Sequence, residues 1–322
     1  MKNMKKMVAL ALAVLLVFGL AACGAPAAPA SPANGGGGDG DRIVVGYAAL
    51  NLSNEFIRTL SDALEQRGEE LGVDVITVDA QDVIERQVAA VEDFIAMGVD
   101  VIILNPIDAE ALNPSVDLAY EAGIPLILVN TFTTNENYVS YVGSSNIVSG
   151  RIQGEFLAEE FAGQDDIYVV ILRGVLGHSA EIERFEGLSE TFLHLPGINI
   201  LADQTGNWSR EEGMRIMEDW LQRYPRIDVL ASHNDEMALG ALEAIMAAGR
   251  LDDILVVGID AIADALTSVA NGEMSATVFQ DAAGQGSSAI EVAVRAARGE
   301  TVNREYDIPF VLVTPANLAD FQ

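Results

Sequence analysis

From Arg42 onward, short and almost continuously apolar runs alternate with longer amphipathic segments. The runs read IVVGYA, VDVITV, VDVIILN, IPLILVN, IYVVIL, INILA, IDVLAS and ILVVGID. Parallel strands covered by helices on both faces are apolar on both sides, so these runs predict buried parallel strands. Each is followed by a stretch with helical character, such as residues 55–71 and 237–248. The alternation predicts an α/β fold with doubly wound parallel sheets.

Two spans of the chain resemble each other. Residues 99–130 and 227–260 each contain a strand that ends in asparagine, a helix, and a second strand that ends in Asn130 or Asp260. The similarity suggests two lobes of similar construction. Any two strand–helix units share such features, so the repeat favours two lobes without requiring them.

Polar side chains follow the ends of several predicted strands. In open parallel sheets, ligands bind beyond the carboxyl ends of the strands, so these side chains are candidate ligand contacts. Asparagine and aspartate are also the preferred helix caps and turn residues, which is the alternative role at each position. We predict capping for Asp235, which begins the segment DEMALGAL, and ligand contact for the others taken together. The candidates are Asn54, Asn105, Asn130, Asn234, Asp260 and Gln280.

The N-terminal segment predicts export. It contains three lysines, an apolar run over residues 8–20 and then LAAC, which ends at Cys23. The run is shorter than the roughly 20 residues of a spanning helix, so residues 1–22 are predicted to be a signal peptide. LAAC resembles the lipobox of bacterial lipoproteins, in which the cysteine is lipidated. The alternative is an incidental cysteine after an ordinary signal.

Residues 23–41 are predicted to connect a lipid anchor to the folded body. After Cys23 the segment is rich in alanine, proline and glycine without hydrophobic periodicity, which is typical of a flexible linker. Cys23 is the only cysteine, so neither an internal disulfide nor a cysteine zinc cluster is possible. A diacylglycerol supplies two acyl chains, enough for stable anchoring.

The charge and the motif content argue against two classes of function. The chain has 18 Lys and Arg against 48 Asp and Glu, a formal net charge of −30, whereas nucleic-acid binding needs clustered basic charge. His178, His194 and His233 lack metal-ligand spacing, no G-x-S-x-G motif occurs, and the glycine-containing segment 174–187 lacks the ending of a P-loop. We therefore predict no catalytic residue, no metal site and no cofactor.

An ordered series of motifs resembles one family. LSNEF, LNPID, AGIPLILVN, GHSAEIERFEG, NDEMALGALEAI, VVGID and ATVFQ occur in the order found in the ribose-binding-like, type I periplasmic binding proteins of sugar ABC transporters. The resemblance covers the chain from Arg42 to about Val313. It implies two Rossmann-like lobes joined by three hinge segments, with residues 42–144 and 281–308 in the N-terminal lobe and residues 145–280 and 309–322 in the C-terminal lobe.

The resemblance also implies roles for individual residues. It places polar contacts to sugar hydroxyls at Asn54, Asn105, Arg184, Asn234, Asp260 and Gln280, and aromatic contacts to the sugar ring at Phe56 and Trp208. Asn130 is expected as a further contact because it follows a predicted strand. A pyranose has apolar C–H faces that suit aromatic rings and hydroxyls that suit amides, carboxylates and arginine.

Some of these positions have alternatives, and two depart from the family pattern. Phe56 could belong to the core, and Arg184 could pair with a glutamate on a solvated face. Trp208 precedes a helix with Ser209 as its expected N-cap, whereas Trp220 is expected to pack in mid-helix. Ribose-type members have an Asp-Arg pair where this chain has Asn130-Thr131, and an aromatic residue where it has Ile259. A sugar other than ribose is therefore expected.

These observations predict a lipid-anchored extracytoplasmic receptor that captures a neutral monosaccharide or related polyol and delivers it to an ABC permease. The protein is expected to act as a monomer that closes around its ligand by hinge motion. A chemoreceptor or signalling ligand carrier would use the same body and stays open as an alternative. A repressor-type effector domain fits less well, because such proteins begin with a helix-turn-helix and a basic surface.

Overall fold

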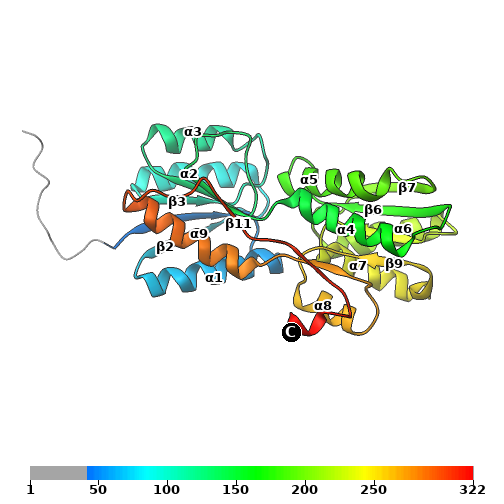
Figure 1. Ribbon diagram of the computed structural model, residues 1–322. Coiled ribbons are helices and arrows are strands. Elements are labelled where there is room, and N and C mark those ends of the chain that lie inside the picture. The colour runs from blue at the N-terminus through cyan, green and yellow to red at the C-terminus, as the bar shows by residue number, and fades with distance from the viewer. Residues whose placement is uncertain (1–41, 322) are drawn as a thin grey trace, which may run out of the picture. The chain divides into compact units, whose positions relative to one another are not determined.

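The computed structural model describes residues 42–321, which form an α/β structure with parallel sheets in two lobes (Figure 1). The predicted signal peptide, Cys23 and the linker lie outside the described residues. Among residues 42–321, no helix has the length and apolar character needed to cross a membrane.

The first lobe is built on a six-stranded sheet in the order β11-β5-β4-β3-β1-β2, with all neighbours parallel. Its strands are β1 (Val44–Ala49), β2 (Asp74–Asp79), β3 (Val101–Leu104), β4 (Leu126–Val129), β5 (Ser140–Gly143) and β11 (Glu305–Asp307). Its helices are α1 (Glu55–Leu71), α2 (Ile84–Met97), α3 (Asn113–Glu121) and α9 (Ala282–Ala297).

Side chains alternate between the two faces of this sheet. Tyr47 and Ile103 pack in the cluster that contains α1 and α9, whereas Ala48, Ile102 and Leu104 pack in the cluster that contains α2 and α3. Figure 1 shows the two pairs of helices on opposite sides of the sheet. Coverage of both faces is the reason that the strands read as continuous apolar runs.

The second lobe has a four-stranded parallel sheet in the order β7-β6-β8-β9. Its strands are β6 (Ile167–Arg173), β7 (Ile198–Thr205), β8 (Val229–Ser232) and β9 (Leu255–Val257). Its helices are α4 (Asn146–Glu160), α5 (Ser179–Leu188), α6 (Arg210–Arg223), α7 (Asp235–Ala247) and α8 (Ala263–Ala270), with short helical turns at Ser189–Leu193, Leu251–Asp253 and Leu318–Asp320.

The same alternation covers both faces of the second sheet. Ile171 packs with Leu157 of α4 and Leu188 of α5, whereas Leu172 and Leu230 belong to the cluster that contains α6 and α7. Trp220 is almost fully buried in that cluster, which confirms the prediction that it packs in mid-helix.

The chain passes between the lobes in three places. It passes from β5 of the first lobe to α4 of the second, and it returns from β10 (Thr277–Phe279) to α9 of the first lobe. It then passes again from β11 of the first lobe to β12 (Val311–Val313). Strands β10 and β12 pair with each other in antiparallel fashion, which the run of parallel strands in the sequence did not predict. The predicted lobe boundaries, after residues 144, 280 and 308, stay a prediction.

The junction between β8 and α7 corrects one prediction. The N-cap of α7 is Asn234, whose side chain accepts from the backbone N–H of Met237 at 3.0 Å, so the prediction that Asp235 caps this helix is wrong. Asp235 is instead fully buried and accepts from the Thr277 hydroxyl at 2.7 Å and from the Ile262 N–H at 3.0 Å. These long-range partners attach α7 to the loop that follows β9, and local sequence gives no sign of them.

Candidate ligand-binding site

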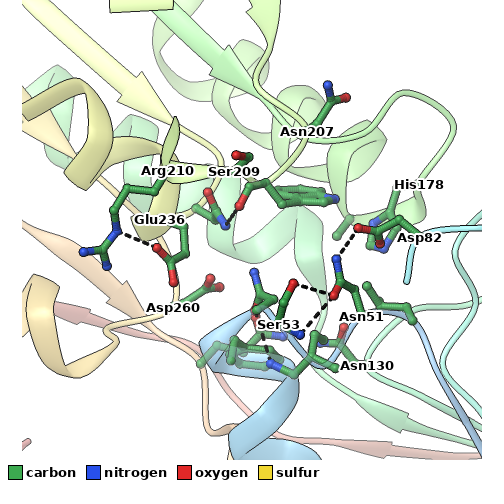
Figure 2. A pocket seen from close by; sticks show the side chains of 18 of the residues that line it. Asn51, Ser53, Asp82, Asn130, His178, Asn207, Ser209, Arg210, Glu236 and Asp260 are labelled. Atoms are coloured by element: carbon green, nitrogen blue, oxygen red, sulfur yellow. Dashed lines mark hydrogen bonds and ion pairs between the residues drawn. The ribbon is translucent and has the colours of Figure 1, made fainter. Parts of the chain in front are cut away.

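A cavity of about 380 Å³ lies between the lobes and is lined by residues from both (Figure 2). Asn51 and Asn130 follow β1 and β4 of the first lobe, and Asn234 and Asp260 follow β8 and β9 of the second. The cavity therefore lies beyond the carboxyl ends of the strands, where open parallel sheets bind ligands. Its size is that of a small-molecule site.

The two lobes contact each other through hydrogen bonds. The N–H of Ala109 in the first lobe donates to the carbonyl of Gly177 in the second at 3.1 Å. The N–H of Phe132 donates to the Ser179 hydroxyl, also at 3.1 Å. Such contacts hold the lobes together without using the side chains that line the cavity.

Asn54 and Asn234 line the cavity and also cap helices. The Asn54 side chain accepts from the Ile57 N–H at 3.2 Å, and Asn234 accepts from Met237 in the same way. Each cap uses the Oδ1 atom and so fixes the orientation of the amide, whose Nδ2 carries two donor hydrogens. The Nδ2 of Asn234 also donates to the Trp208 carbonyl at 3.4 Å, which leaves it one further hydrogen. The capping and ligand-binding roles are thus compatible at these two positions.

Asn130 is held by a buried polar network. Its φ of 63° is a left-handed conformation that asparagine adopts more readily than most residues. The Tyr141 hydroxyl donates to its carbonyl at 3.0 Å, and its Nδ2 donates to Gln285 Oε1 at 3.2 Å. Gln285 in turn donates to the Ser144 hydroxyl at 2.9 Å, so the amide of Asn130 is anchored to the segment where the chain leaves the first lobe.

Arg184 is the buried cation of the site. Its side chain on α5 is almost completely buried, so the alternative of a glutamate pair on a solvated face is wrong. It donates to Asn146 Oδ1 at 3.2 Å, to Gln280 Oε1 at 2.8 Å and to the carbonyl of His233, and it lies 3.5 Å from Asp260 Oδ1. Burial lowers the pKa of the guanidinium, and Asp260 opposes that shift.

Asp260 occupies a backbone conformation that few residues adopt. Its φ is 122°, and strain of this kind persists only where the surrounding structure imposes it. Burial raises the pKa of its carboxyl to about 7, although the charge of Arg184 lowers it, and Glu236 adds to the rise. The backbone N–H of Asp260 donates to the Val278 carbonyl at 2.8 Å, and Asp235 accepts from the Ile262 N–H of the same loop at 3.0 Å.

Trp208 and Phe56 are the aromatic residues of the cavity. Trp208 lies between β7 and α6, directly before Ser209, which accepts from Glu212 and is the N-cap of α6 as predicted. A Cβ atom at Gly174 would lie 1.9 Å from the indole, so glycine there leaves room for the ring. Phe56 is buried at the start of α1 and contacts the core as well as the cavity.

Asn105 is the predicted site residue that does not line the cavity. Its side chain is fully buried and donates to the Val129 carbonyl at 3.1 Å and to the Thr131 hydroxyl at 2.8 Å. Its Nδ2 also lies 3.5 Å from Asn130 Oδ1. The amide of Asn105 is thus bonded to the loop after β4. Asn105 therefore supports that loop from behind Asn130 and does not face the cavity.

The cavity is also lined by polar residues that the sequence had not indicated. Several of them also follow strand ends. The rule that selected Asn54 after β1 would have found them if it had included every polar residue after β1 and had been applied to β2, β6 and β7. Arg210 and Glu236 form an ion pair at 2.7 Å that depends on the packing of α6 on α7, and no local pattern indicates it. The additional polar lining residues are Asn51, Ser53, Asp82, His178, Asn207, Ser209, Arg210, Glu211 and Glu236.

The charges of the lining residues disfavour anions. Arg184 and Arg210 face four carboxylates, those of Asp82, Glu211, Glu236 and Asp260. The lining thus carries more acidic than basic groups, and an anionic ligand would have to approach this excess. In the part of the chain that the structure describes, no group of three or more His, Cys, Asp and Glu side chains could hold a metal ion.

Two lobes whose strand ends surround a polar cavity define a ligand-binding protein, and comparison with known proteins identifies the family. Residues 45–301 match the periplasmic binding protein domain, so the chain belongs to that family. It is 37% identical over 286 residues to a putative rhizopine-binding protein of Rhizobium meliloti, covering 86% of this chain and 92% of the relative. It is 33% identical over 262 residues to the ribose import binding protein of Salmonella typhimurium, covering 81% and 87%.

A solved structure is also similar. An ABC transporter solute-binding protein from Bacillus halodurans, with bound myo-inositol, superimposes with a TM-score of 0.84 at 39% identity. The match covers 88% of this chain and 99% of that protein. The family is one of substrate-binding proteins.

Proposed function

We propose that this chain is an extracytoplasmic substrate-binding protein that holds a neutral monosaccharide or polyol between its lobes and delivers it to an ABC importer. The observation that carries the proposal is the cavity, where amide side chains from both lobes converge with two aromatic rings and one buried arginine. The ribose import protein and the inositol-bound structure among its relatives support the same ligand class.

In this proposal the polar lining residues bind the ligand hydroxyls, and the aromatic residues contact its apolar faces. Asn54, Asn130, Asn234 and Gln280 present amides that both donate to and accept from hydroxyls, and Arg184 and Asp260 present a donor and an acceptor. Phe56 and Trp208 cover the apolar faces of the ligand. Capture of this kind needs no chemical step, so we assign no catalytic residue.

Ligand contacts from both lobes would favour the closed arrangement over an open one, since a ligand shifts an equilibrium toward the state that it binds better. The segments near residues 144, 280 and 308 would serve as the hinge. A permease that recognises the closed state would then receive only loaded protein. A chemoreceptor would use the same closure, and a binding assay with the purified permease distinguishes the two roles.

A thermal-shift panel tests the ligand class. We expect at least one strong stabiliser among D-ribose, D-glucose, D-allose and myo-inositol, and no stabilisation by uronic acids or sugar phosphates. A ligand that binds only the folded state at a thousandfold excess over Kd raises the free energy of unfolding by about 4 kcal/mol. The acidic excess of the lining is the physical reason for the exclusion of anions.

The same panel with Asn130→Asp provides the control, because that variant changes one ligand-facing group from neutral to acidic and should reorder the sugars. A panel in which only anions, amino acids or peptides raise the melting temperature would overturn both the charge argument and the sugar assignment.

We further propose that Cys23 carries a lipid anchor. Replacement of Cys23 by alanine is expected to move the protein from the membrane fraction to the soluble fraction, because the lipid would be lost with its thiol. Membrane fractionation combined with a radiolabelled fatty acid measures this. The stabilising sugar should shift the melting temperature of the variant as it does that of the wild type. A variant that stays membrane-bound and labelled contradicts the anchor.

A further inference from the structure

Gln285 is a fully buried side chain of α9 that does not line the cavity. Its amide bridges two other side chains: Oε1 accepts from Asn130 Nδ2 at 3.2 Å, and Nε2 donates to the Ser144 hydroxyl at 2.9 Å. Two other fully buried glutamines, Gln87 and Gln153, bond backbone atoms. Gln285 differs from them because it bonds the side chain of a residue that lines the cavity.

The direction of the hydrogen bonds around Asn130 is set by a backbone carbonyl. The Thr131 hydroxyl donates its single hydrogen to the Pro106 carbonyl at 2.8 Å. It can therefore only accept from its second partner, Asn105 Nδ2, which also lies at 2.8 Å. The amide of Asn105 is oriented in this way, and the same Nδ2 lies 3.5 Å from Asn130 Oδ1. A donor thus faces the oxygen of Asn130.

The nitrogen of Asn130 depends on Gln285. Within residues 42–321, Asn130 Nδ2 donates to no group other than Gln285 Oε1. Rotation of the Asn130 amide by half a turn would bring two donors together at one end and two acceptors together at the other, so one orientation is favoured. In that orientation one hydrogen of Nδ2 and one lone pair of Oδ1 remain for a ligand.

We propose that Gln285 is a positioning residue of the ligand site, which orients the amide of Asn130 and so determines where that amide donates to and accepts from a ligand hydroxyl. This inference rests on the proposed function, since it assigns a support to one of the proposed ligand contacts. Hydrogen bonds weaken steeply when they are bent, so a misoriented amide would bind the same hydroxyl less well. Gln285 itself acts from behind the cavity lining.

The test is the affinity, by calorimetry, of the compound that stabilises most in the panel above. Gln285→Met keeps the length of the side chain but removes the acceptor. We expect it to weaken binding about five- to tenfold, because the amide of Asn130 then loses a partner and is ordered only when ligand binds. Gln285→Glu, ionised or protonated, keeps an oxygen that accepts from Asn130 Nδ2. It should retain the wild-type affinity to within about threefold.

Gln153→Met is the matched control. Gln153 is fully buried in α4 of the second lobe, and its Nε2 donates to the carbonyls of Ser232 at 2.9 Å and Val257 at 3.3 Å. The replacement removes the same chemical group without touching Asn130, so it should change the affinity less than about twofold. Melting temperatures without sugar report any general damage in either variant.

Combination with Asn130→Ala distinguishes positioning from general support of the fold. If Gln285 acts through Asn130, Gln285→Met should change the affinity less than about twofold in the Asn130→Ala background, where the amide is absent. Mono-deoxy analogues of the same compound provide an independent measurement. The analogue that the wild type and Asn130→Ala bind alike lacks the hydroxyl that Asn130 contacts. Gln285→Met should bind that analogue as the wild type does.

Ser144→Ala keeps the inference testable if Gln285→Met does not fold. It removes only the hydroxyl that holds the far end of the Gln285 amide. We expect it to weaken binding about two- to threefold in the wild type and to have no further effect in Asn130→Ala, because its influence also passes through Asn130.

Three results would overturn the inference: wild-type affinity in Gln285→Met, equal losses in Gln285→Met and Gln285→Glu, or a loss of the same size with and without Asn130→Ala. The first and third apply equally to Ser144→Ala if that variant replaces Gln285→Met. A wild-type protein that binds no sugar or polyol would overturn the proposed function itself and is recognised before any variant is made.

Discussion

Trp208→Ala is expected to weaken sugar binding by about 1–3 kcal/mol, the range for a nucleobase stacked on an aromatic side chain, or roughly 5- to 150-fold. The indole lines the cavity, and its place against Gly174 leaves it little freedom to move. Alanine removes that apolar surface and leaves a void that water would fill. Calorimetric titration measures the loss.

Two variants make this test specific. Trp220 is buried in the core away from the cavity, so Trp220→Phe should keep the fluorescence change that ligand causes through Trp208. Gly174→Ala should displace the indole and weaken binding in the wild type, but should have little further effect in Trp208→Ala, where the clash is gone. Normal binding by Trp208→Ala would assign the residue to packing alone.

Arg184→Met is expected to weaken sugar binding by about 100-fold or more and to lower the melting temperature. Methionine fills much of the volume but leaves Asn146 Oδ1 and Gln280 Oε1 without their donor and the carboxyl of Asp260 without its cation. Removing one member of a buried ion pair costs about 3–5 kcal/mol. Calorimetry and thermal unfolding measure the two effects.

The loss of stability in Arg184→Met is expected to depend on pH in a defined direction. Burial raises the pKa of the Asp260 carboxyl, and Arg184 opposes that rise, so the pKa should be still higher in Arg184→Met. A carboxyl whose pKa is raised by folding destabilises the protein increasingly as pH rises above its unfolded pKa. The difference in melting temperature from the wild type should therefore shrink as pH falls from about 8 to about 5.

Arg173→Met is the control for a lost ion pair outside the cavity. Arg173 pairs with the buried Glu181 in the same lobe and does not line the cavity. Its replacement should lower the melting temperature but leave the affinity nearly unchanged. Arg184→Met with wild-type affinity would exclude the guanidinium from ligand binding.

The elements of the fold follow closely from the sequence. The predicted helix over residues 55–71 is α1 with the same limits, and each predicted apolar run contains a strand. Each strand is buried on both faces of its sheet, so each is an apolar run that can be recognised in its own short segment of sequence. The short strands β5 and β11 were not predicted. The sequence of β11, EYD, is polar, and it is recognisable as a strand only from its parallel pairing with β5.

The candidate site was predictable where a polar residue lies within three residues of the end of a buried strand, as at Asn130, Asn234 and Asp260. The same rule placed Asn105 in the cavity, but the structure places it behind Asn130, because the loop after β4 binds its amide first. A strand end fixes the edge of the sheet where a side chain lies. It does not fix whether the side chain meets a ligand or the next loop.

The sequence by itself determined the α/β class, the strands, the principal helices and the edge of the sheets at which polar residues gather, because periodicity and strand ends are local properties. Only the tertiary structure decided which of these residues share one cavity, that Asp235 bonds the loop beside Asp260, and that the buried ring nitrogens of His178 have no hydrogen-bond partner within residues 42–321. Those facts depend on segments far apart in the chain, and on burial, which no local pattern of residues records.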